Sequence, residues 1–540
     1  MAEMKGEQGT VSVNQNKKFL KGTLILTISS IVVKVIGALN WVILSRVMGG
    51  EGIGIYQMGF PLYLMAITVS SAGLPVAISI ITAEKVAQED YTGAQRVFQV
   101  SLRMLFCTGI FFSLCLIGLA HYLVDNRIIP DPRAYYSIIA LAPAVFFVTF
   151  LSSFRGYFQG WQIMTPTACS EITEQLVRVV TMIAFSALFM PYGLTFAAAG
   201  ASMGAGAGAF CGLLVLLGFY RKLRHQFYPK EKTIEAVPHP LEPAGKIIKR
   251  LISLAIPVSM SSLMLPVVSN LDMMIVPRRL MAGGWSLGEA TTLFGYLTGM
   301  AVPLINMSTI LTAALSISLV PSISESRTLQ DSAGIREKVA TAFSVAAVIT
   351  IPCSVGLHVL GGRVAALIYN APKAGPAIET MSWAIFLLGL HQVSTGILQG
   401  LGKTKIPVLN MILAAVSKVL LNWNLTPTMG IVGSSWATVS DIGVAALLNL
   451  FFIKKYTGFS LEIKPLFKIM ASAVVMGAAV RGVLTMIPRG GMSILGGMVV
   501  ALPVYAVLLL ALKTMPEEEL RQIPFLGRRM AALGHKLHLL

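Results

Sequence analysis

Fourteen long apolar runs divide the chain, and each is long enough to cross a lipid bilayer as one helix. Such a crossing needs about 20 apolar residues. The runs cover residues 22–44, 57–82, 98–123, 135–154, 168–190, 194–219, 251–276, 293–320, 339–360, 380–399, 407–425, 430–453, 467–487 and 494–513. They lack the alternating segments of a membrane barrel, the other structure that can span hydrocarbon. The sequence therefore predicts an all-α polytopic membrane protein with about fourteen transmembrane helices.

The charges are unevenly spread along the chain. Only 12% of the 540 residues are charged, about half of the roughly 25% that is typical of soluble domains, yet the formal net charge is +18. Basic residues gather before the first run, between the sixth and seventh, after the twelfth, and in the tail. With fourteen crossings these segments share one side, which the positive-inside rule assigns to the cytoplasm. We expect both termini there, and a surplus charge that attracts anionic lipids rather than nucleic acid.

The motifs of enzymes and cofactor sites are missing from the sequence. It contains no Walker loop, so we do not expect an ATPase. The five cysteines lie in apolar runs without metal-ligand spacing, and we expect them to be buried and free of disulfides: Cys107, Cys115, Cys169, Cys211 and Cys353. Residues 1–21 are polar, and the run that follows is too long for a secretory signal. We expect no metal site, no cofactor and no catalytic residue.

One short motif occurs twice in the chain. Gln159-Gly160 and Gln399-Gly400 each follow an apolar run and precede a proline, 240 positions apart. Similar shifts relate Tyr56 to Tyr296, Glu84 to Glu325, Arg178 to Lys418, and residues 39–46 to residues 271–278. Because a period of six helices keeps their orientation, the repeat predicts two parallel six-helix lobes. We expect the motif to be a turn with its glycine at the helix end and the proline opening the next helix. A substrate contact is the less favoured alternative.

The repeat divides the chain into four parts. We expect an N-terminal lobe at residues 1–220, a basic cytoplasmic linker at 221–250, a C-terminal lobe at 251–455, and helices 13 and 14 with a cytoplasmic tail at 456–540. Transporters built from such repeats bind their substrate between them. The glycine-rich residues 200–212 indicate close helix packing rather than phosphate binding.

Ionisable side chains inside the runs are the candidate site, because each costs roughly 2.5–3.5 kcal/mol or more without water or a partner. Lys34 lies near the middle of the first helix and is expected to face a substrate cavity, with a structural ion pair as the alternative. Asn40 and Arg46 follow at six-residue intervals, about 120° apart on a helix, so the three do not form one stripe. Arg46 and Arg278 are repeat mates at the outer helix ends. They could grip a diphosphate from both lobes or anchor the helices at the interface, and the sequence favours neither.

A second pair of repeat mates, Arg178 and Lys418, lies deeper in the runs. Glu171, Glu174 and Arg178 share one helix face, and we expect a Glu174–Arg178 ion pair with Arg178 at the cavity. In the other lobe we expect a charged cluster of Asp272, Lys418, Asn422 and Asp441. It could bind a coupling Na+ or H+, or the lysine could take the place of the ion.

Three segments carry a family resemblance. They are residues 19–79, which begin FLKGTLILTISSIVVKVIGALNWVILSRVMGG, residues 155–166, RGYFQGWQIMTP, and residues 191–204, PYGLTFAAAGASMG. The chain resembles the stage V sporulation protein B family along essentially its whole length. That family is a branch of the multidrug/oligosaccharidyl-lipid/polysaccharide exporter superfamily, and the lipid II flippases are its relatives. Those relatives place arginines at positions matching Lys34 and Asn40, so this cavity is less cationic than theirs.

The resemblance implies a flippase of the bacterial plasma membrane with two lobes around a cationic cavity. Its substrate would be an undecaprenyl-diphosphate-linked saccharide, such as a lipid II-like peptidoglycan precursor or a related polysaccharide unit. Its role would lie in cell-wall synthesis and sporulation, with cell-wall synthesis proteins as partners. Two alternatives stay open. A cation-coupled multidrug exporter would favour an acidic, aromatic cavity, and a non-transporting scaffold of a cell-wall synthesis complex would need no charge in the membrane.

Overall fold

Helices make up the secondary structure of the described part of the chain. The computed structural model describes residues 2–71, 73–231, 242–460, 463–487, 490–512 and 514. They belong to two compact units, the first comprising Met1–Met48 and Ile55–Met274 and the second Gly49–Gly54 and Ile275–Leu540. The all-α prediction is confirmed, because the described residues contain no β-strand.

The helices are as follows. The first unit holds most of α1 (Ala2–Ser71) and α7 (Ala244–Ala282), together with α2 (Leu74–Ala87), α3 (Tyr91–Asp125), α4 (Ala134–Gly160), α5 (Thr165–Phe189), η1 (Met190–Tyr192) and α6 (Leu194–Glu231). The second holds α8 (Leu287–Gly295), η2 (Tyr296–Ala301), α9 (Val302–Ser308), α10 (Ile310–Thr328), α11 (Ser332–Tyr369), η3 (Pro372–Ala374), α12 (Gly375–Met381), α13 (Trp383–Gly400), α14 (Lys405–Met429), α15 (Ile431–Thr457), α16 (Ile463–Met486) and α17 (Gly491–Ala511).

The number of membrane spans agrees with the apolar runs. In the described residues, 10 helices are long and apolar enough to cross a membrane, or 13 if each of three bent pairs is one span. One of them, Ile25–Ala87, is 63 residues long and covers two of the predicted runs. Gly49 interrupts it with the non-helical angles φ 65 and ψ −174. The predicted run 293–320 is a bent pair, because its helix turns by 53° near Thr309.

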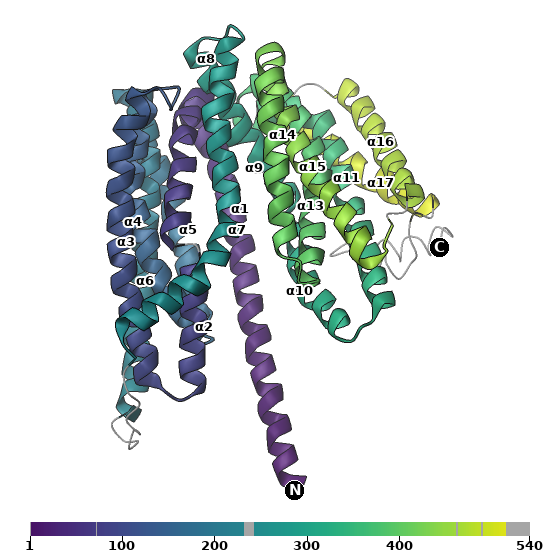
Figure 1. Cartoon of the computed structure of the whole chain (residues 1–540). Coiled ribbons are helices and arrows are strands. Elements are labelled where there is room, and N and C mark those ends of the chain that lie inside the picture. The colour runs from purple at the N-terminus through teal and green to yellow at the C-terminus, as the bar shows by residue number, and fades with distance from the viewer. Residues whose placement is uncertain are drawn as a thin grey trace. The chain divides into compact units, whose positions relative to one another are not determined.

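The first unit packs α3, α4 and α6 side by side, with α2 and α5 against them (Figure 1). Its core joins apolar side chains from α2, α3, α4, α6 and the start of α7. Aromatic rings fill its centre, with Phe98 lying 4.5 Å from Tyr157 and 5.0 Å from Tyr220 between ring centroids. Rings of this size at such distances add stabilisation beyond their apolar burial.

The second unit packs α10, α11 and α15 against α13, and α14 against α15 (Figure 1). Residues Gly49–Gly54 of α1 also belong to it. A Cβ at Gly54 would collide with the backbone of Thr291 in α8, and one at Gly295 would collide with the backbone of Gly50. Glycine at these positions therefore lets the two helices approach closely.

The turns repeat between the two units. Left-handed backbone occurs at Glu89 (φ 58) and Gln330 (φ 55), and again at Gln162 (φ 57) and Gly402 (φ 71). Each pair is separated by the shift of 240 or 241 positions found in the sequence. An aspartate then caps the next helix in both units, Asp90 for α3 and Asp331 for α11. The predicted parallel repeat is therefore also present in the loop geometry.

The Gln-Gly motif ends a helix in each unit, as predicted, but its glycines do not adopt the left-handed conformation of the turn. Gly160 and Gly400 end α4 and α13, but the left-handed residue of each turn comes two positions later, at Gln162 and Gly402. A Cβ at Gly160 would lie 2.5 Å from Cβ of Thr82, and one at Gly400 would lie 2.8 Å from Cβ of Ile323. These glycines therefore serve close packing of neighbouring helices.

The boundary between the units differs from the predicted lobes. The linker was expected at residues 221–250, but α6 extends to Glu231 and α7 begins at Ala244. The first 31 residues of α7, up to Met274, belong to the first unit. The physical reason is packing, since Ile247, Leu251 and Ala255 are buried in the first unit's core. The predicted tail lies largely outside the described residues.

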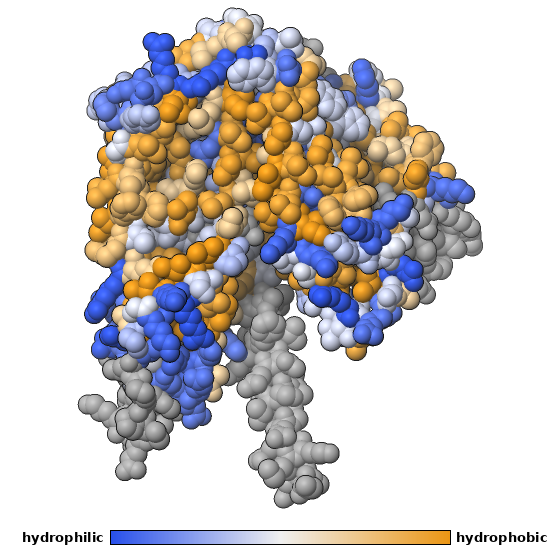
Figure 2. Space-filling model, viewed as in Figure 1, coloured by the Kyte–Doolittle hydropathy of each residue, from blue (hydrophilic) through white to orange (hydrophobic). Residues whose placement is uncertain are grey.

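Apolar side chains cover much of the helix exteriors, with hydrophilic residues gathered towards helix ends (Figure 2). Phe111, Val180 and Leu447 are each at least 60% exposed. Exposed apolar surface of this extent fits helices that face lipid. The expected burial of the cysteines is wrong for the same reason, because Cys107, Cys115 and Cys353 are exposed and Cys169 and Cys211 are half-buried. All five are free thiols.

Candidate functional site: charges within the spanning helices

The predicted ion pair on α5 is present in the first unit. Arg178 donates from Nη2 to Oε1 of Glu174 at 2.7 Å. Both side chains are largely buried, 20% and 12% exposed. Glu174 also accepts at Oε2 from Nη2 of Arg155 on α4 at 2.8 Å. One carboxylate therefore bridges two guanidinium groups from neighbouring helices.

Sequence reasoning missed Arg155 and Tyr63. Arg155 lies near the end of α4, where it also donates to Oγ of Ser170 at 3.0 Å. The sequence does contain a sign of Arg155, because it is a charged residue five positions before Gly160. It lies in a helix that extends past the predicted apolar run. Tyr63 on α1 is 2% exposed and lies close to Arg178. Arg178 thus has neighbours on its own helix and on α1.

Close packing of α5 against α6 supports this cluster. A Cβ at Gly208 would lie 2.5 Å from the carbonyl oxygen of Glu174, and one at Gly212 would lie 3.3 Å from Oγ of Ser170. The glycine-rich residues 200–212 therefore bring α6 against the helix that carries the ion pair. This confirms their interpretation as a packing motif.

Lys34 and Asn40 lie on different faces of α1. Lys34 is exposed, among exposed apolar residues that include Ile31 and Val35. Asn40 is 4% exposed, and its Nδ2 lies 3.7 Å from Sδ of Met182 on α5. Its Oδ1 has no hydrogen-bond partner among the described residues. The predicted angular separation of these side chains therefore agrees with the structure.

Arg46 and Arg278 are both exposed, Arg46 on the first-unit part of α1 and Arg278 on the second-unit part of α7. The neighbouring Arg279, which sequence reasoning did not single out, contacts Trp423 of α14 in two ways. Its Nε donates to the carbonyl oxygen of Trp423 at 3.0 Å, and its Cζ lies 4.3 Å from the centre of the Trp423 ring. Arg279 therefore fixes the end of α7 beside α14.

The structure brings together two members of the charged cluster predicted for the second lobe. Nζ of Lys418 on α14 lies 3.7 Å from Oδ2 of Asp441 on α15, with the side chains 6% and 16% exposed. Asn422, one turn after Lys418, is 1% exposed and accepts from Oγ1 of Thr426 at 3.3 Å. Asp272 lies on the part of α7 that belongs to the first unit, whereas the Lys418–Asp441 pair belongs to the second.

The two repeats neutralise matching cations in different ways. Arg178 pairs with Glu174 on its own helix, but the position matching Glu174 in α14 is Ala414. Lys418 pairs instead with Asp441 on the next helix, at the position that matches Gly208. Each lobe thus holds a basic side chain and a carboxylate at the same depth of the repeat.

A polar cluster in the second unit was also missed. Asn449 on α15 accepts at Oδ1 from Nδ2 of Asn410 on α14 at 2.8 Å. Its own Nδ2 lies 3.1 Å from Oγ of Ser394 and 3.4 Å from Nδ1 of His391 on α13. These hydrogen bonds join three helices. No group of three His, Cys, Asp or Glu side chains in the described part of the chain could hold a metal ion.

Known proteins are similar to this chain in sequence and in fold. A family described as polysaccharide biosynthesis protein matches residues 19–327. The chain is 29% identical over 518 residues to stage V sporulation protein B of Bacillus subtilis (strain 168), covering 94% of this chain and 98% of that protein. It is 25% identical over 487 residues to the Lipid II flippase MurJ of the same organism, covering 86% and 88%.

Solved structures with this fold are transporters. A Lipid II flippase MurJ in an inward closed conformation matches with a TM-score of 0.67 and 16% identity, over 90% of this chain and 98% of that one. An inward-facing multidrug resistance MATE family transporter of the MOP superfamily matches with a TM-score of 0.63 and 16% identity, over 81% and 98%. The resemblance noted in the sequence is confirmed. Because the family match covers more than half of its residues, the chain belongs to the polysaccharide biosynthesis protein family, and it is a multi-pass membrane protein with the fold of the MurJ and MATE transporter structures.

Proposed function

We propose that the protein is a flippase that moves an undecaprenyl-diphosphate-linked saccharide from the inner to the outer leaflet by alternating access. The observation that carries this proposal is the surplus of cations over carboxylates among the candidate residues of the helices. The six cations are Lys34, Arg46, Arg155, Arg178, Arg278 and Lys418, and the four carboxylates are Glu171, Glu174, Asp272 and Asp441. The name of the similar Lipid II flippase supports the same substrate class.

The chemistry of such a substrate fits these residues. A diphosphate cannot cross hydrocarbon unaided, and guanidinium or ammonium groups replace its hydration shell. The prenyl tail stays in lipid while the repeats expose the bound head group to one leaflet and then the other. A membrane potential that is negative inside drives an anionic head group outward by about 2.3 kcal/mol per charge per 100 mV.

The Lys418–Asp441 pair bears on the coupling ion. The ammonium of Lys418 lies 3.7 Å from the carboxylate of Asp441. It therefore balances the negative charge that a bound Na+ would otherwise balance. We therefore favour the membrane potential or protons over Na+ as the driving force. Replacing Na+ by choline on both sides of proteoliposomes should leave the transport rate unchanged, and an absolute need for Na+ would contradict this.

The same pairs weigh against a cation-coupled drug exporter. A cation-coupled exporter needs a carboxylate that can bind the coupling cation. Glu174 is already hydrogen-bonded to two arginines. A non-transporting scaffold would give no translocation at all, and experiment can distinguish it directly.

The test is translocation of lipid II by the full-length protein in proteoliposomes. We expect transport by the wild type and loss of at least about tenfold in Lys34→Ala. Lys373→Ala, which removes a charge from η3 ahead of the predicted run 380–399, is the matched control and should transport normally. A folded wild type that moves no lipid II would overturn this substrate, and loss in both variants would remove the special role of Lys34.

A further inference from the structure

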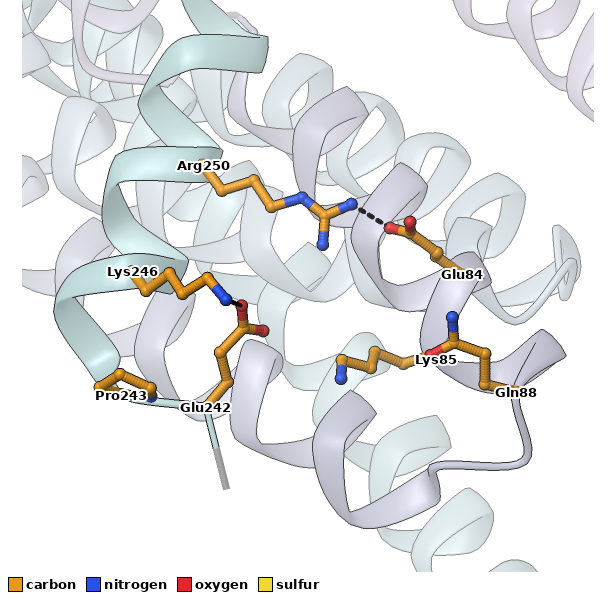
Figure 3. A pocket seen from close by; sticks show the side chains of 7 residues that line it. All are labelled: Glu84, Lys85, Gln88, Glu242, Pro243, Lys246 and Arg250. Atoms are coloured by element: carbon orange, nitrogen blue, oxygen red, sulfur yellow. Dashed lines mark hydrogen bonds and ion pairs between the residues drawn. The ribbon is translucent and has the colours of Figure 1, made fainter. Parts of the chain in front are cut away.

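A charged pocket lies in the first unit between the end of α2 and the start of α7 (Figure 3). Its volume is about 450 Å³. The lining residues are Glu84, Lys85, Gln88, Glu242, Pro243, Lys246 and Arg250. None of them is among the candidate transport residues, so the pocket is separate from the proposed flippase site.

Every charge in this pocket has an opposite charge beside it. Arg250 of α7 pairs with Glu84 of α2, and these two side chains point towards each other across the pocket (Figure 3). Lys246 lies 3.4 Å from Glu242 between Nζ and Oε1. Lys85 donates to Oδ2 of Asp90 at 3.0 Å. The pocket therefore offers both carboxylates and cations to a ligand.

This mixture decides the class of ligand. A ligand with only a negative charge would meet two carboxylates, and a ligand with only a positive charge would meet three cations. A zwitterion can instead place its anionic group beside the cations and its cationic group beside the carboxylates, without leaving a charge unbalanced. The exposed pairs in the pocket are also weak, because solvent screens them, so the exchange is easy.

The first half of α7 indicates that this zwitterion is a lipid. Ile247, Leu251 and Ala255 are buried against the unit, but Ile252, Ile256 and Met260 are 41%, 52% and 61% exposed. The exposed residues form an apolar stripe at four-residue spacing, and it begins two positions after Arg250. The segment Ala244–Met260 is bent by 49° from Ser262–Ala282. Basic residues beside an apolar stripe are typical of a helix that lies in the membrane interface.

We propose that the pocket binds the head group of an ethanolamine phospholipid. Arg250 and Lys246 take its phosphate, Glu84 and Glu242 take its ammonium, and an acyl chain follows Ile252, Ile256 and Met260. The ammonium donates three hydrogen bonds to carboxylates, which a trimethylated choline cannot do. A glycerol head group carries no cation for the two carboxylates.

The experiment is native mass spectrometry of the full-length protein with phosphatidylethanolamine, phosphatidylcholine or phosphatidylglycerol of equal chain length. We expect the ethanolamine lipid to be retained roughly threefold to tenfold better than the other two. Equal retention of all three lipids, or a preference for the glycerol lipid, would overturn the proposal.

Variants separate the pocket from general attraction to the membrane. Glu84→Gln should abolish the preference and raise retention of the glycerol lipid, because one carboxylate is lost. Exchanging the pair, Glu84→Arg with Arg250→Glu, should keep the ethanolamine preference. Lys249→Gln removes a charge from the same helix outside the pocket and is the control. If it acts like Glu84→Gln, the effect belongs to the helix as a whole and the proposal fails.

Discussion

Arg178 and Lys418 occupy matching positions of α5 and α14, and each has a carboxylate partner inside its own unit. Removing one member of a largely buried pair costs more than the pair itself contributes, because the remaining charge is left without compensation. The carboxylate lies on the same helix as the cation in the first unit and on the next helix in the second. This difference allows a test in which the carboxylate partner of Lys418 is moved from α15 to α14.

Asp441→Ala should destabilise the protein by about 3–5 kcal/mol. Adding Ala414→Glu should recover much of this loss, because it places a carboxylate four residues before Lys418, as Glu174 stands before Arg178. Thermal unfolding of the purified protein in detergent measures both effects. Ala414→Gln with Asp441→Ala is the control, and an equal recovery there would mean that charge is not what restores stability.

A contact of the site could be predicted from the sequence only when both of its residues lie on the same helix. Glu174 and Arg178 are four residues apart on one helix, so helix geometry alone gives their pairing. The contacts of Arg155 with Glu174 and of Lys418 with Asp441 join different helices. They depend on which helices are neighbours, and a single sequence does not contain that information. Tyr63 carries no charge and gave no signal of its contact with Arg178.

At the scale of elements, glycines determine how closely helices pack. Gly208 of α6 touches the backbone of α5, whereas a Cβ at Gly218 of the same helix would meet nothing within 4 Å. Hydropathy locates both residues in one span and does not distinguish them. Only the neighbouring helix gives them different roles.

Gly208→Ala should destabilise the protein by about 1–3 kcal/mol, because the added methyl forces α5 and α6 apart. Gly218→Ala on the same helix should be neutral or stabilise it by up to about 1 kcal/mol through helix propensity. Thermal unfolding of the two variants gives the comparison. Equal effects would show that the close contact at Gly208 does not limit packing.

The turn between α2 and α3 also has a measurable electrostatic contribution. Burial by itself raises the pKa of Asp90, but hydrogen bonds from Lys85, the Gly93 amide and Thr92 outweigh it and hold the pKa below its ordinary value. The carboxylate thus stabilises the fold above the ordinary aspartate pKa of about 3.9. That contribution is lost as the pH falls through the lower, folded-state pKa.

Asp90→Asn keeps a capping side chain but removes the charge. The wild type should therefore be the more stable protein near pH 7, and its advantage should shrink as the pH falls below about 4. Unfolding measured in urea at several pH values tests this. A stability difference that stays constant with pH would contradict the role of the ionised carboxylate.

At the scale of the whole molecule, hydropathy and the repeat predicted the spans and their internal symmetry, but they did not predict the division into units. The expected boundary at residue 250 follows the sequence period, whereas the compact units divide between Met274 and Ile275. The position of this division depends on Ile247, Leu251 and Ala255, which are buried in the core of the first unit. The spacing of these apolar residues in the sequence does not reveal which unit they pack against.

The proposed orientation can be tested with single cysteines in a variant that lacks the five native ones. With both termini in the cytoplasm, Lys373→Cys in η3 should react with an impermeant maleimide added outside intact cells. Lys403→Cys, in the turn after α13, should react only after the membrane is opened. The reverse pattern would place both termini outside.

The assignment of α7 also affects how the protein folds during synthesis. The first unit lacks part of its core until residues 244–274, which follow α6 in the chain, have been made and inserted. Residues Gly49–Gly54 are made early, yet their packing partners in α8 and η2 come more than 230 residues later. The first unit is therefore completed only after the start of the second repeat has been made, and the second unit incorporates a segment that was made with the first.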